Sequence, residues 1–435
     1  MSDKWKILQG DVRAMLKTLP EKSVHCGITS PPYWGLRNYS TNPQIWNITD
    51  KNCKHDWKQK RVPRPNQSGG PSTKQDTNPG SRAVEYKDRA SYSEFCDACG
   101  ALRGELGSEP TPEMFVSNIV EVMREVRRVL RDDAVFWLNI GDSYAGSGKG
   151  GQSDSKRSEN WQPDYAKSHK GIVPEGLKAK DMVGIPWLLA FALRSDGWWL
   201  RSDTIWAKGV SFCKTYSGSC MPESMTGWRY EIDDNGEAVL KKGSWRPTMA
   251  HEYVFMLAKS DKYFCDADAI RETSTGGACI GKQDCDPDGT GAYSHDSMAR
   301  NNPAGRNVRS VWTVNPTGFS EAHFAVFPEG LIEPIIKVST SGKGCCPGCG
   351  SPFVRVLNED KLVVGWRPVC DCGENTPVPC TVLDPFNGSG TTGVVAAKLN
   401  RNYIGIELNP EYVEISRKRL MSTPAAMSKT LDNWF

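Results

Sequence analysis

One segment near the end of the chain, TVLDPFNGSGTTGVVAAKLNRNYIGIEL (residues 381–408), restricts the fold more than any other. A short β-branched run leads into Asp384, a glycine-rich loop and a helical stretch follow, and a second apolar strand closes with Glu407. Glycines let a ligand approach the backbone at a helix N-terminus, and an acidic residue ending the next strand can hold the two hydroxyls of a ribose. The order predicts a strand–loop–helix–strand unit of an α/β fold that binds a nucleoside.

The composition of this loop indicates which nucleoside it accepts. Dinucleotide sites have a third glycine placed to fit a pyrophosphate, whereas here Asp384 stands where a phosphate would be repelled. A carboxylate suits a cationic ligand, and S-adenosylmethionine carries a sulfonium and an amino group but no phosphate. A purely structural glycine turn is the alternative. The residues predicted to bind the cofactor in this segment are Asp384, Pro385, Phe386, Gly388, Ser389, Gly390, Thr391, Glu407 and Asn409.

The rest of the chain repeats the alternation of strands and helices. Residues 4–33 have the pattern of a strand, a short helix around Val12–Leu19 and a second strand that ends at two prolines. Thr111–Asp142 has that of a helix followed by a buried strand. This alternation predicts an α/β fold with a mostly parallel, twisted sheet. With 435 residues and 38% apolar content, the chain suffices for one large domain with insertions or for two smaller ones.

Charge and hydropathy narrow the class of protein. The chain has 54 basic and 51 acidic residues, and a formal charge of +3 is too balanced to indicate nucleic-acid binding by itself. Neither a secretory apolar region nor an apolar stretch of membrane-spanning length occurs in the sequence. We therefore expect a cytoplasmic protein with no membrane association.

The second predicted strand is followed directly by a four-residue motif, Ser30-Pro31-Pro32-Tyr33. Two consecutive prolines fix the backbone and remove two amide donors, so the carbonyl oxygens around them cannot all be used by ladder bonding. A stiff bend with a hydroxyl, free carbonyl oxygens and an aromatic ring could bind a flat molecule that bears an amino group. An ordinary proline turn is the alternative.

Two groups of cysteine and histidine have the spacing of metal ligands. The first, a C-x-H and a C-x-x-C that flank a basic loop, consists of Cys53, His55, Cys96 and Cys99. The second, a C-x-x-C and a C-x-C with room for a hairpin between them, consists of Cys346, Cys349, Cys370 and Cys372. Neither group leaves an obvious open coordination position, so both predict structural Zn²⁺, with redox pairs as the alternative. In the second group Cys345 could replace Cys346.

The order of the motifs carries a family resemblance. The chain resembles the amino-group DNA methyltransferases of the circularly permuted beta class, in which a [DNS]-P-P-[YFW] catalytic motif comes first and an F-x-G-x-G cofactor loop comes last. Here Ser30–Tyr33 lies near the start and Phe386–Gly390 near the end. The segments HFAVFPEGLIEPII and AHEYVFMLAKSDKYFCD are similar to those that precede the cofactor loop and form the target pocket in that class.

The resemblance implies a Rossmann-like methyltransferase fold with permuted motif order, together with zinc-knuckle and loop insertions. It implies that S-adenosylmethionine is the cofactor. Asp11 would contact its adenine, Glu407 its ribose, and Phe324 with Phe386 would line its site.

The resemblance also implies a mechanism. An exocyclic amine is a poor nucleophile because its lone pair is delocalised into the ring. Hydrogen bonds from the amine to the Ser30 hydroxyl and the Pro31 carbonyl would free that lone pair for attack on the methyl group, and Tyr33 would stack on a base flipped out of the duplex. Because no covalent intermediate is needed, Cys380 is interpreted as a packing residue, although Pro379-Cys380 is similar to the nucleophile motif of cytosine-C5 methyltransferases.

The predicted reaction is methyl transfer from S-adenosylmethionine to an exocyclic amine of double-stranded DNA. Serine at the first motif position favours N4 of cytosine, with N6 of adenine as the runner-up. Two other classes remain as alternatives: a methyltransferase acting on RNA or on a protein amide, and a non-catalytic zinc-containing DNA-binding protein. A restriction endonuclease partner is compatible with the sequence, which leaves the oligomeric state open.

Two basic, polar segments are candidate DNA contacts, with solvated surface loops as the alternative. They are Lys54–Arg64 and Ala299–Ser310, the latter with Arg300, Arg306 and Arg309.

The predicted organisation is a catalytic part of the core (1–50), a basic insertion with a zinc site (51–104), core with loop insertions (105–272), a target-recognition insertion (273–310), a cofactor-site segment (311–343), a zinc knuckle (344–375), the S-adenosylmethionine-binding part of the core (376–424) and a tail (425–435).

Overall fold

The computed structural model describes most of the chain. The described residues are 4–35, 41–47, 50, 52–61, 92–145, 173, 176–213, 218, 228–232, 238–243, 245–273, 305–316, 326–359 and 362–423. The helices are α1 (Val12–Lys17), α2 (Pro112–Val129), α4 (Ile185–Ser195), the 3-10 helix η1 (Ala267–Ile270), α5 (Glu329–Ser339), α6 (Thr391–Lys398) and α7 (Pro410–Met421). The strands are β1 (Trp5–Gln9), β2 (Val24–Thr29), β3 (Gln44–Trp46), β4 (Trp57–Arg61), β5 (Tyr92–Cys96), β6 (Leu102–Gly104), β7 (Leu130–Ile140), β8 (Trp199–Ala207), β9 (Trp228–Ile232), β10 (Ala238–Lys242), β11 (His251–Ala258), β12 (Val311–Thr313), β13 (Val354–Leu357), β14 (Val363–Arg367), β15 (Thr381–Asp384) and β16 (Asn402–Glu407).

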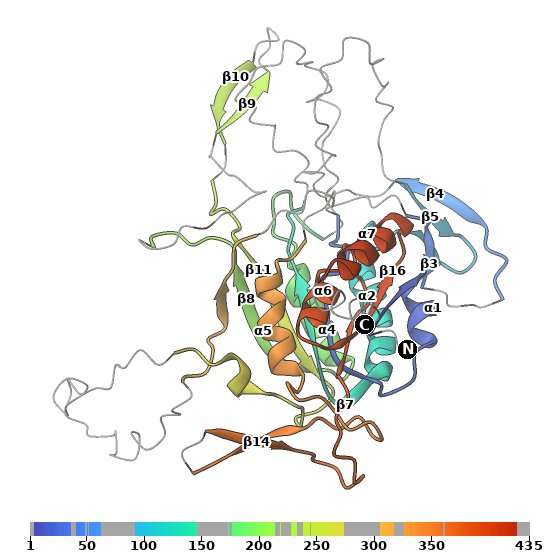
Figure 1. The fold of residues 1–435 in the computed structure, drawn as a ribbon. Coiled ribbons are helices and arrows are strands. Elements are labelled where there is room, and N and C mark those ends of the chain that lie inside the picture. The colour runs from blue at the N-terminus through green and yellow to red at the C-terminus, as the bar shows by residue number, and fades with distance from the viewer. Residues whose placement is uncertain are drawn as a thin grey trace.

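An eight-stranded sheet forms the centre of the fold, in the order β1-β16-β15-β2-β7-β11-β8-β12 (Figure 1). Neighbours from β1 to β7 pair in parallel, β11 runs antiparallel to both β7 and β8, and β12 is parallel to β8. In β2 every residue except His25 is buried, and β7 is buried without a break from Ala134 to Ile140, as expected where a strand is covered on both faces of the sheet. The predicted α/β fold with a mostly parallel sheet is confirmed.

Helices cover both faces of this sheet. Helices α1, α2 and α4 contribute to one apolar cluster, which includes Phe115 and Leu189, and α5, α6 and α7 contribute to a second, which includes Ile335 and Val395. Figure 1 shows α5, α6 and α7 together on one side of the sheet. Helix α2 begins where the sequence predicts, because the Thr111 hydroxyl accepts from the Met114 amide and a proline follows it. Of the helices that the structure describes, none has the length and apolarity needed to cross a membrane.

Three small sheets lie outside the central one. A four-stranded sheet has the order β3-β6-β5-β4, and β9 pairs with β10 and β13 with β14 as antiparallel hairpins. The β13–β14 hairpin lies between the two halves of the Cys346–Cys372 group, as the sequence predicts.

The predicted site residues converge at one edge of the central sheet. Because β1, β16, β15, β2 and β7 are parallel, their carboxyl ends meet there, and the residues that end or follow them include Asp11, Glu407, Asp384, Ser30 and Asn139. Strand β11 runs the other way, so its beginning lies at this edge. Ligands of open α/β sheets bind outside the carboxyl ends of the strands, so this edge is the candidate site.

Candidate active site

The Ser30–Tyr33 motif directly follows β2 and begins a chain of hydrogen bonds. Ser30 Oγ donates to Tyr33 Oη across 3.2 Å. The Tyr33 hydroxyl lies 2.7 Å from Glu252 Oε2 and 3.1 Å from Asn139 Oδ1. A hydroxyl has one proton, and the closer, charged oxygen is the stronger acceptor. The chain therefore runs from Ser30 through Tyr33 to the carboxylate of Glu252.

Glu252 is held as an anion at the start of β11. Its side chain is 14% exposed and forms an ion pair with Lys208, which follows β8. Asn139 Nδ2 donates to Glu252 Oε2 across 3.0 Å. Burial alone would raise the pKa of Glu252, but the Lys208 charge and the hydrogen bonds outweigh burial, and the pKa lies below its ordinary value. The carboxylate is therefore ionised at neutral pH and fixes the direction of the Tyr33 hydroxyl.

Asp384 joins the catalytic motif to the glycine loop. Its Oδ1 accepts from the Thr29 hydroxyl at 2.6 Å and from the Phe386 amide at 3.1 Å, and its Oδ2 accepts from the Thr392 hydroxyl at 2.7 Å. The residue is 1% exposed, and burial raises its pKa to about 6. Sequence reasoning gave this carboxylate to a cationic ligand, whereas in the structure Oδ1 joins the end of β2 to the glycine loop and Oδ2 joins that loop to the first turn of α6.

Gly388 in the glycine loop and Glu407 at the end of β16 are joined by a hydrogen bond. Glu407 Oε2 accepts from the Gly388 amide and Oε1 from the Asn409 amide, both at 2.8 Å, and burial raises the pKa of Glu407. The Leu408 amide also interacts with this carboxylate, which has about four lone-pair positions, so one acceptor position remains. A Cβ at Gly388, whose φ is +51°, would have the Phe386 carbonyl oxygen at 4.0 Å as its nearest neighbour. This open space above Gly388, the cradle, has a lining that would fit a nucleoside.

The neighbouring loop residues have packing roles that the sequence did not predict. A Cβ at Gly390 would lie 2.7 Å from the Cβ of Ser416 on α7, so this glycine permits close helix contact. Arg419 Nη1 donates to the Ser389 hydroxyl at 2.9 Å and to the Thr391 hydroxyl at 3.0 Å. These contacts make the loop rigid beneath the cradle.

The remaining predicted cofactor residues are placed differently. Asp11 caps α1 and pairs with Arg13 at 2.9 Å; burial opposes its ionisation, but Arg13 and the cap hydrogen bonds hold its pKa below the usual value. Asp11 also lines a surface hollow of about 1050 Å³ between α1, α2 and α4. Phe386, which follows Pro385, packs against the core. The Asn409 side chain caps α7 through the Glu411 amide, and Phe324 lies outside the described residues.

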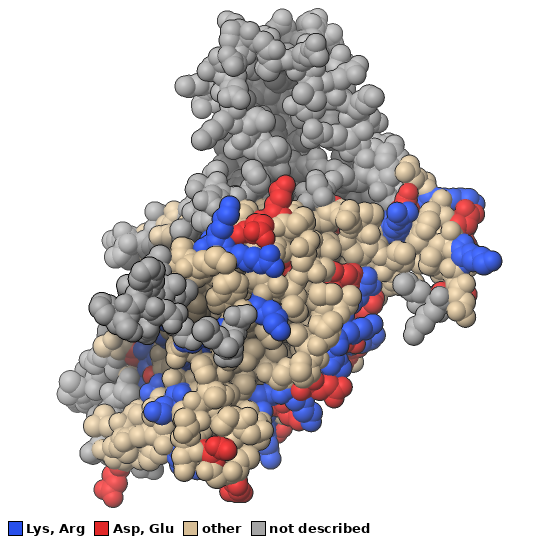
Figure 2. Space-filling model, turned by 45° about the vertical axis from the view of Figure 1, so that its right-hand side comes forward, with Lys and Arg blue, Asp and Glu red and all other residues tan. Residues whose placement is uncertain are grey.

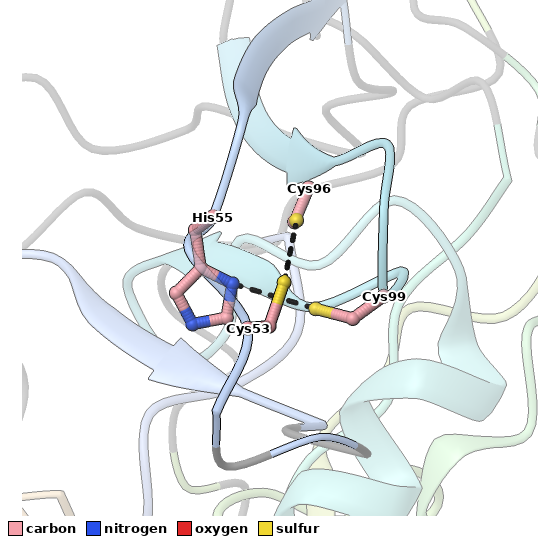
Figure 3. A group of neighbouring side chains, drawn as sticks. All are labelled: Cys53, His55, Cys96 and Cys99. Atoms are coloured by element: carbon pink, nitrogen blue, oxygen red, sulfur yellow. Dashed lines mark hydrogen bonds between the residues drawn. The ribbon is translucent and has the colours of Figure 1, made fainter.

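The structure brings the Cys53, His55, Cys96 and Cys99 side chains together (Figure 3). Cys53 Sγ lies 3.7 Å from Cys96 Sγ, and Cys99 Sγ lies 3.4 Å from His55 Nδ1. All four ligand atoms lie within 4.8 Å of one another. The two halves of this group are far apart in sequence and meet because β4 pairs with β5.

The second predicted group also assembles, and the structure selects among its cysteines. The ligand atoms of Cys346, Cys349, Cys370 and Cys372 lie within 4.8 Å of one another. Cys345 instead faces His25 and Cys380. Both ring nitrogens of His25 are engaged, Nδ1 by the Thr381 amide at 3.0 Å and Nε2 by the Gly350 carbonyl at 2.9 Å. Cys346 is therefore the fourth member of the thiolate group, and Cys380 is fully buried, as a packing residue should be.

Comparison with known proteins identifies the family. The family model of the DNA methylases, which covers N6 and N4 methylation, matches residues 24–347 and 374–418 of the chain. The chain belongs to the DNA methylase family. The resemblance drawn from the order of the motifs is confirmed, and DNA and S-adenosylmethionine follow as the substrate and methyl donor of this family.

Several relatives of this DNA methylase cover nearly its whole length. The type II methyltransferase M.Cfr9I of Citrobacter freundii is 32% identical over 414 residues, which are 95% of this chain and 87% of that protein. The type II methyltransferase M.XycI of Xanthomonas campestris pv. cyanopsidis is 33% identical over the same shares. Among solved structures, the cytosine-N4-specific PvuII DNA methyltransferase aligns over 99% of this chain and 92% of its own, at 14% identity and a TM-score of 0.46.

Sequence reasoning missed three residues of the methylase site, namely Asn139, Lys208 and Glu252. Each lies at the end or the beginning of an apolar strand, in the contexts FWLNIGD, IWAKG and AHEYVF. A polar side chain at the border of a buried strand is a signal that sequence alone provides. Their convergence on Tyr33 depends on the antiparallel direction of β11, which no local pattern indicates.

The predicted DNA-contact segments are only partly described. Arg306 Nε lies 2.8 Å and Arg309 Nη2 3.0 Å from the same Glu272 oxygen, while their side chains stay 43% and 70% exposed. Arg300 and residues 62–64 lie outside the described residues. Figure 2 shows basic and acidic side chains interspersed over the described part of one face of the methylase. The charges of the described residues on that face do not form a single basic patch.

Proposed function

We propose that this DNA methylase transfers a methyl group from S-adenosylmethionine to the N4 amine of cytosine in duplex DNA. The observation that carries the proposal is the Ser30–Tyr33–Glu252 chain beside the Gly388 cradle. The Thr29–Asp384 hydrogen bond of 2.6 Å fastens the two together. The Ser30–Tyr33 motif, which would hold the amine, and the glycine loop, which would hold the methyl donor, are thereby fixed relative to each other.

The direction of the hydrogen-bond chain gives Ser30 its role. A serine hydroxyl has one proton and two acceptor positions. Because the proton goes to Tyr33, the lone pairs of Ser30 remain for the amine of the target base. The amine donates to Ser30 Oγ and to the Pro31 carbonyl, which favours a pyramidal nitrogen with an available lone pair.

The remaining groups position the two reactants. The Tyr33 ring stacks on the base once the base leaves the duplex. Glu407 accepts from the ribose hydroxyls, the backbone of Gly388 borders the cradle, and Asp384 acts as a positioning residue. When bound, S-adenosylmethionine supplies an electrophilic methyl group on a sulfonium.

Serine at position 30 supports cytosine N4 as the target, by the resemblance stated for the S-P-P-Y motif. Adenine N6 is the second candidate, because the matching family model covers both amines. The name shared by the relatives, type II methyltransferase, supports a role in restriction-modification with a restriction endonuclease as the functional partner.

Zinc at both cysteine groups completes the proposal. Tetrahedral Zn²⁺ with Zn–S near 2.3 Å and Zn–N near 2.0 Å places two sulfurs about 3.8 Å apart and a sulfur and a nitrogen about 3.6 Å apart. The corresponding distances in the first group are 3.7 and 3.4 Å. A disulfide would need about 2.0 Å. These distances support metal binding over a redox pair.

The experiment that tests the function is nucleoside mass spectrometry. Unmethylated genomic DNA is incubated with the protein and S-adenosylmethionine, with Tyr33→Ala as the matched control. N4-methylcytosine that is absent from the control is the expected result. N6-methyladenine would overturn the base assignment, and no modified base would overturn the proposed activity, after which RNA and protein substrates are tested in the same way.

A further inference from the structure

The two metal groups share one turn. Cys96 N donates to the Ala101 carbonyl at 2.9 Å and Gly100 N to the Cys96 carbonyl at 2.8 Å. In the second group Cys346 N donates to the Ser351 carbonyl and Gly350 N to the Cys346 carbonyl, both at 2.8 Å. The two glycines have φ of +71° and +73°. The four-thiolate group has the spacing of a zinc knuckle, and an identical turn in the first group indicates the same ligand.

The first group lies in a sheet whose outer half has little core of its own. Among the described side chains of β4 and β5, Cys96 is the one that is fully buried. The inner strands differ, because Trp46 on β3 and Leu102 on β6 are each 1% exposed and pack with the helices. Cys99 lies in the turn before β6, and Cys53 lies between β3 and β4 (Figure 3). A bound metal would replace the missing apolar core of the outer half.

The inner half of this sheet supports the catalytic loop. Strand β6 leads into Gly107, whose carbonyl accepts from the Gly35 amide at 2.7 Å. The indole of Trp34 donates to the Glu109 carbonyl at 2.9 Å. A Cβ at Gly107 would lie 2.9 Å from the Tyr33 carbonyl oxygen, so the two backbones are in contact. The residues that follow β6 are thus the surface against which Tyr33–Gly35 rests.

We infer that a Zn²⁺ ion held by Cys53, His55, Cys96 and Cys99 is a clamp that positions the catalytic loop. The ion would link the turn before β6 to the segment that follows β3. The residues that follow β6 are those that contact Tyr33 and Gly35. The ring of Trp57, tilted by 32° with its centroid 4.6 Å from that of His55, packs against the imidazole and restricts its orientation. The second zinc group flanks the β13–β14 hairpin and contacts β2 near its start, where the Gly350 carbonyl lies 2.9 Å from His25 Nε2, whereas Tyr33 follows the end of that strand. The inference deepens the proposed function and rests on it only for the kinetic readout.

The test measures zinc, loop protection and turnover in the full-length protein. Zinc per chain is determined by inductively coupled plasma mass spectrometry, and amide exchange of the peptide containing residues 30–35 by hydrogen–deuterium exchange. Cys99→Ser should lose one zinc and exchange this peptide faster. Its turnover, counted as tritiated methyl groups in DNA whatever the base, should fall on the order of 10- to 100-fold with S-adenosylmethionine affinity unchanged, since small misplacement of reacting groups has effects of this size.

Two further variants make the outcome decisive. Cys372→Ser in the second group should also lose one zinc but leave exchange of residues 30–35 unchanged. His55→Cys keeps four ligands and should retain two zinc ions and wild-type exchange, which gives a readable result if Cys99→Ser does not fold. Wild-type protein with fewer than two zinc ions, or metal loss in Cys99→Ser without faster exchange, would overturn the clamp. The exchange readout needs no activity, so failure of the proposed methylation is seen separately.

Discussion

Tyr33→Phe is the sharpest perturbation of the proposed site. It removes the hydroxyl that accepts from Ser30 at 3.2 Å and donates to Glu252 at 2.7 Å. The ring that would stack on the target base remains. Without an acceptor at Tyr33, the Ser30 proton is no longer directed away from the amine, and Ser30 loses its fixed role as an acceptor.

The magnitude follows from the type of hydrogen bond removed. A hydrogen bond to a charged group contributes about 1.5–3 kcal/mol, and each 1.36 kcal/mol of activation free energy changes a rate about tenfold. The methyl-transfer rate of Tyr33→Phe should therefore fall about 10- to 150-fold. Affinity for S-adenosylmethionine should stay unchanged, because the hydrogen bond between Gly388 and Glu407 that borders the cradle does not involve the Tyr33 hydroxyl.

Single-turnover transfer of tritiated methyl groups to DNA measures this rate, and calorimetry measures cofactor affinity. The matched control is Tyr33→Ala, which removes the ring as well and should cost a further 1–3 kcal/mol or about 5- to 150-fold, the range of base–aromatic stacking. A Tyr33→Phe rate equal to that of the wild type would refute the role of the hydroxyl chain. Equal rates for the Phe and Ala variants would refute stacking by the ring.

Three other perturbations have defined outcomes. Burial raises the pKa of Asp384 from 3.8 to about 6, so between these two pH values the folded state binds a proton that the unfolded state has lost, and the free energy of unfolding falls as pH rises. In urea unfolding, the difference in this free energy between wild type and Asp384→Asn should fall by up to about 3 kcal/mol from pH 4 to pH 7. A difference that stays constant with pH would contradict this. Gly390→Ala places a methyl group 2.7 Å from the Ser416 side chain on α7 and should lower the free energy of unfolding by about 1–3 kcal/mol, measured by thermal unfolding. Gly388→Ala should chiefly weaken S-adenosylmethionine binding, measured by calorimetry. The reverse pattern would contradict the packing role of Gly390 and the binding role of Gly388. Arg306→Ala and Arg309→Ala should each weaken DNA binding. The slope of log binding constant against log salt concentration should become smaller by about 1 for each phosphate that the variant no longer neutralises. Unchanged binding in a salt titration would contradict the assignment of residues 273–310 as the recognition insertion.

The cofactor half of the fold could be predicted because its signals are local. The run from Thr381 to Glu407 contains a strand, a turn with glycines and a helix within one short segment, and propensity and turn chemistry agree there. The strand that ends at Thr29, just before the Ser30–Tyr33 motif, was predicted for the same reason. The meeting of the cysteine and histidine side chains in two groups was predicted from their spacing, which does not depend on the connecting loops.

The roles of individual residues could not be predicted, because they are set by contacts between distant segments. Thr29 and Asp384 are 355 positions apart, and only sheet pairing turns the carboxylate toward the hydroxyl. Gly390 is explained by a helix that follows later in the chain, and Glu252 by the direction of β11. Cys345 and Cys346 are adjacent in sequence and differ only in the side of the chain on which their thiols lie.

The strand order has a consequence for how the protein is made. Strands β15 and β16, which follow all other described strands of this sheet in sequence, lie between β1 and β2. During synthesis β1 therefore has no partner among the described strands of this sheet, and β2 keeps one edge open, until residues 381–407 have left the ribosome. Unpaired apolar edges promote aggregation, and pairing over such sequence distances is slow. A nascent chain of this methylase should be a client of ribosome-associated chaperones until β15 and β16 have emerged.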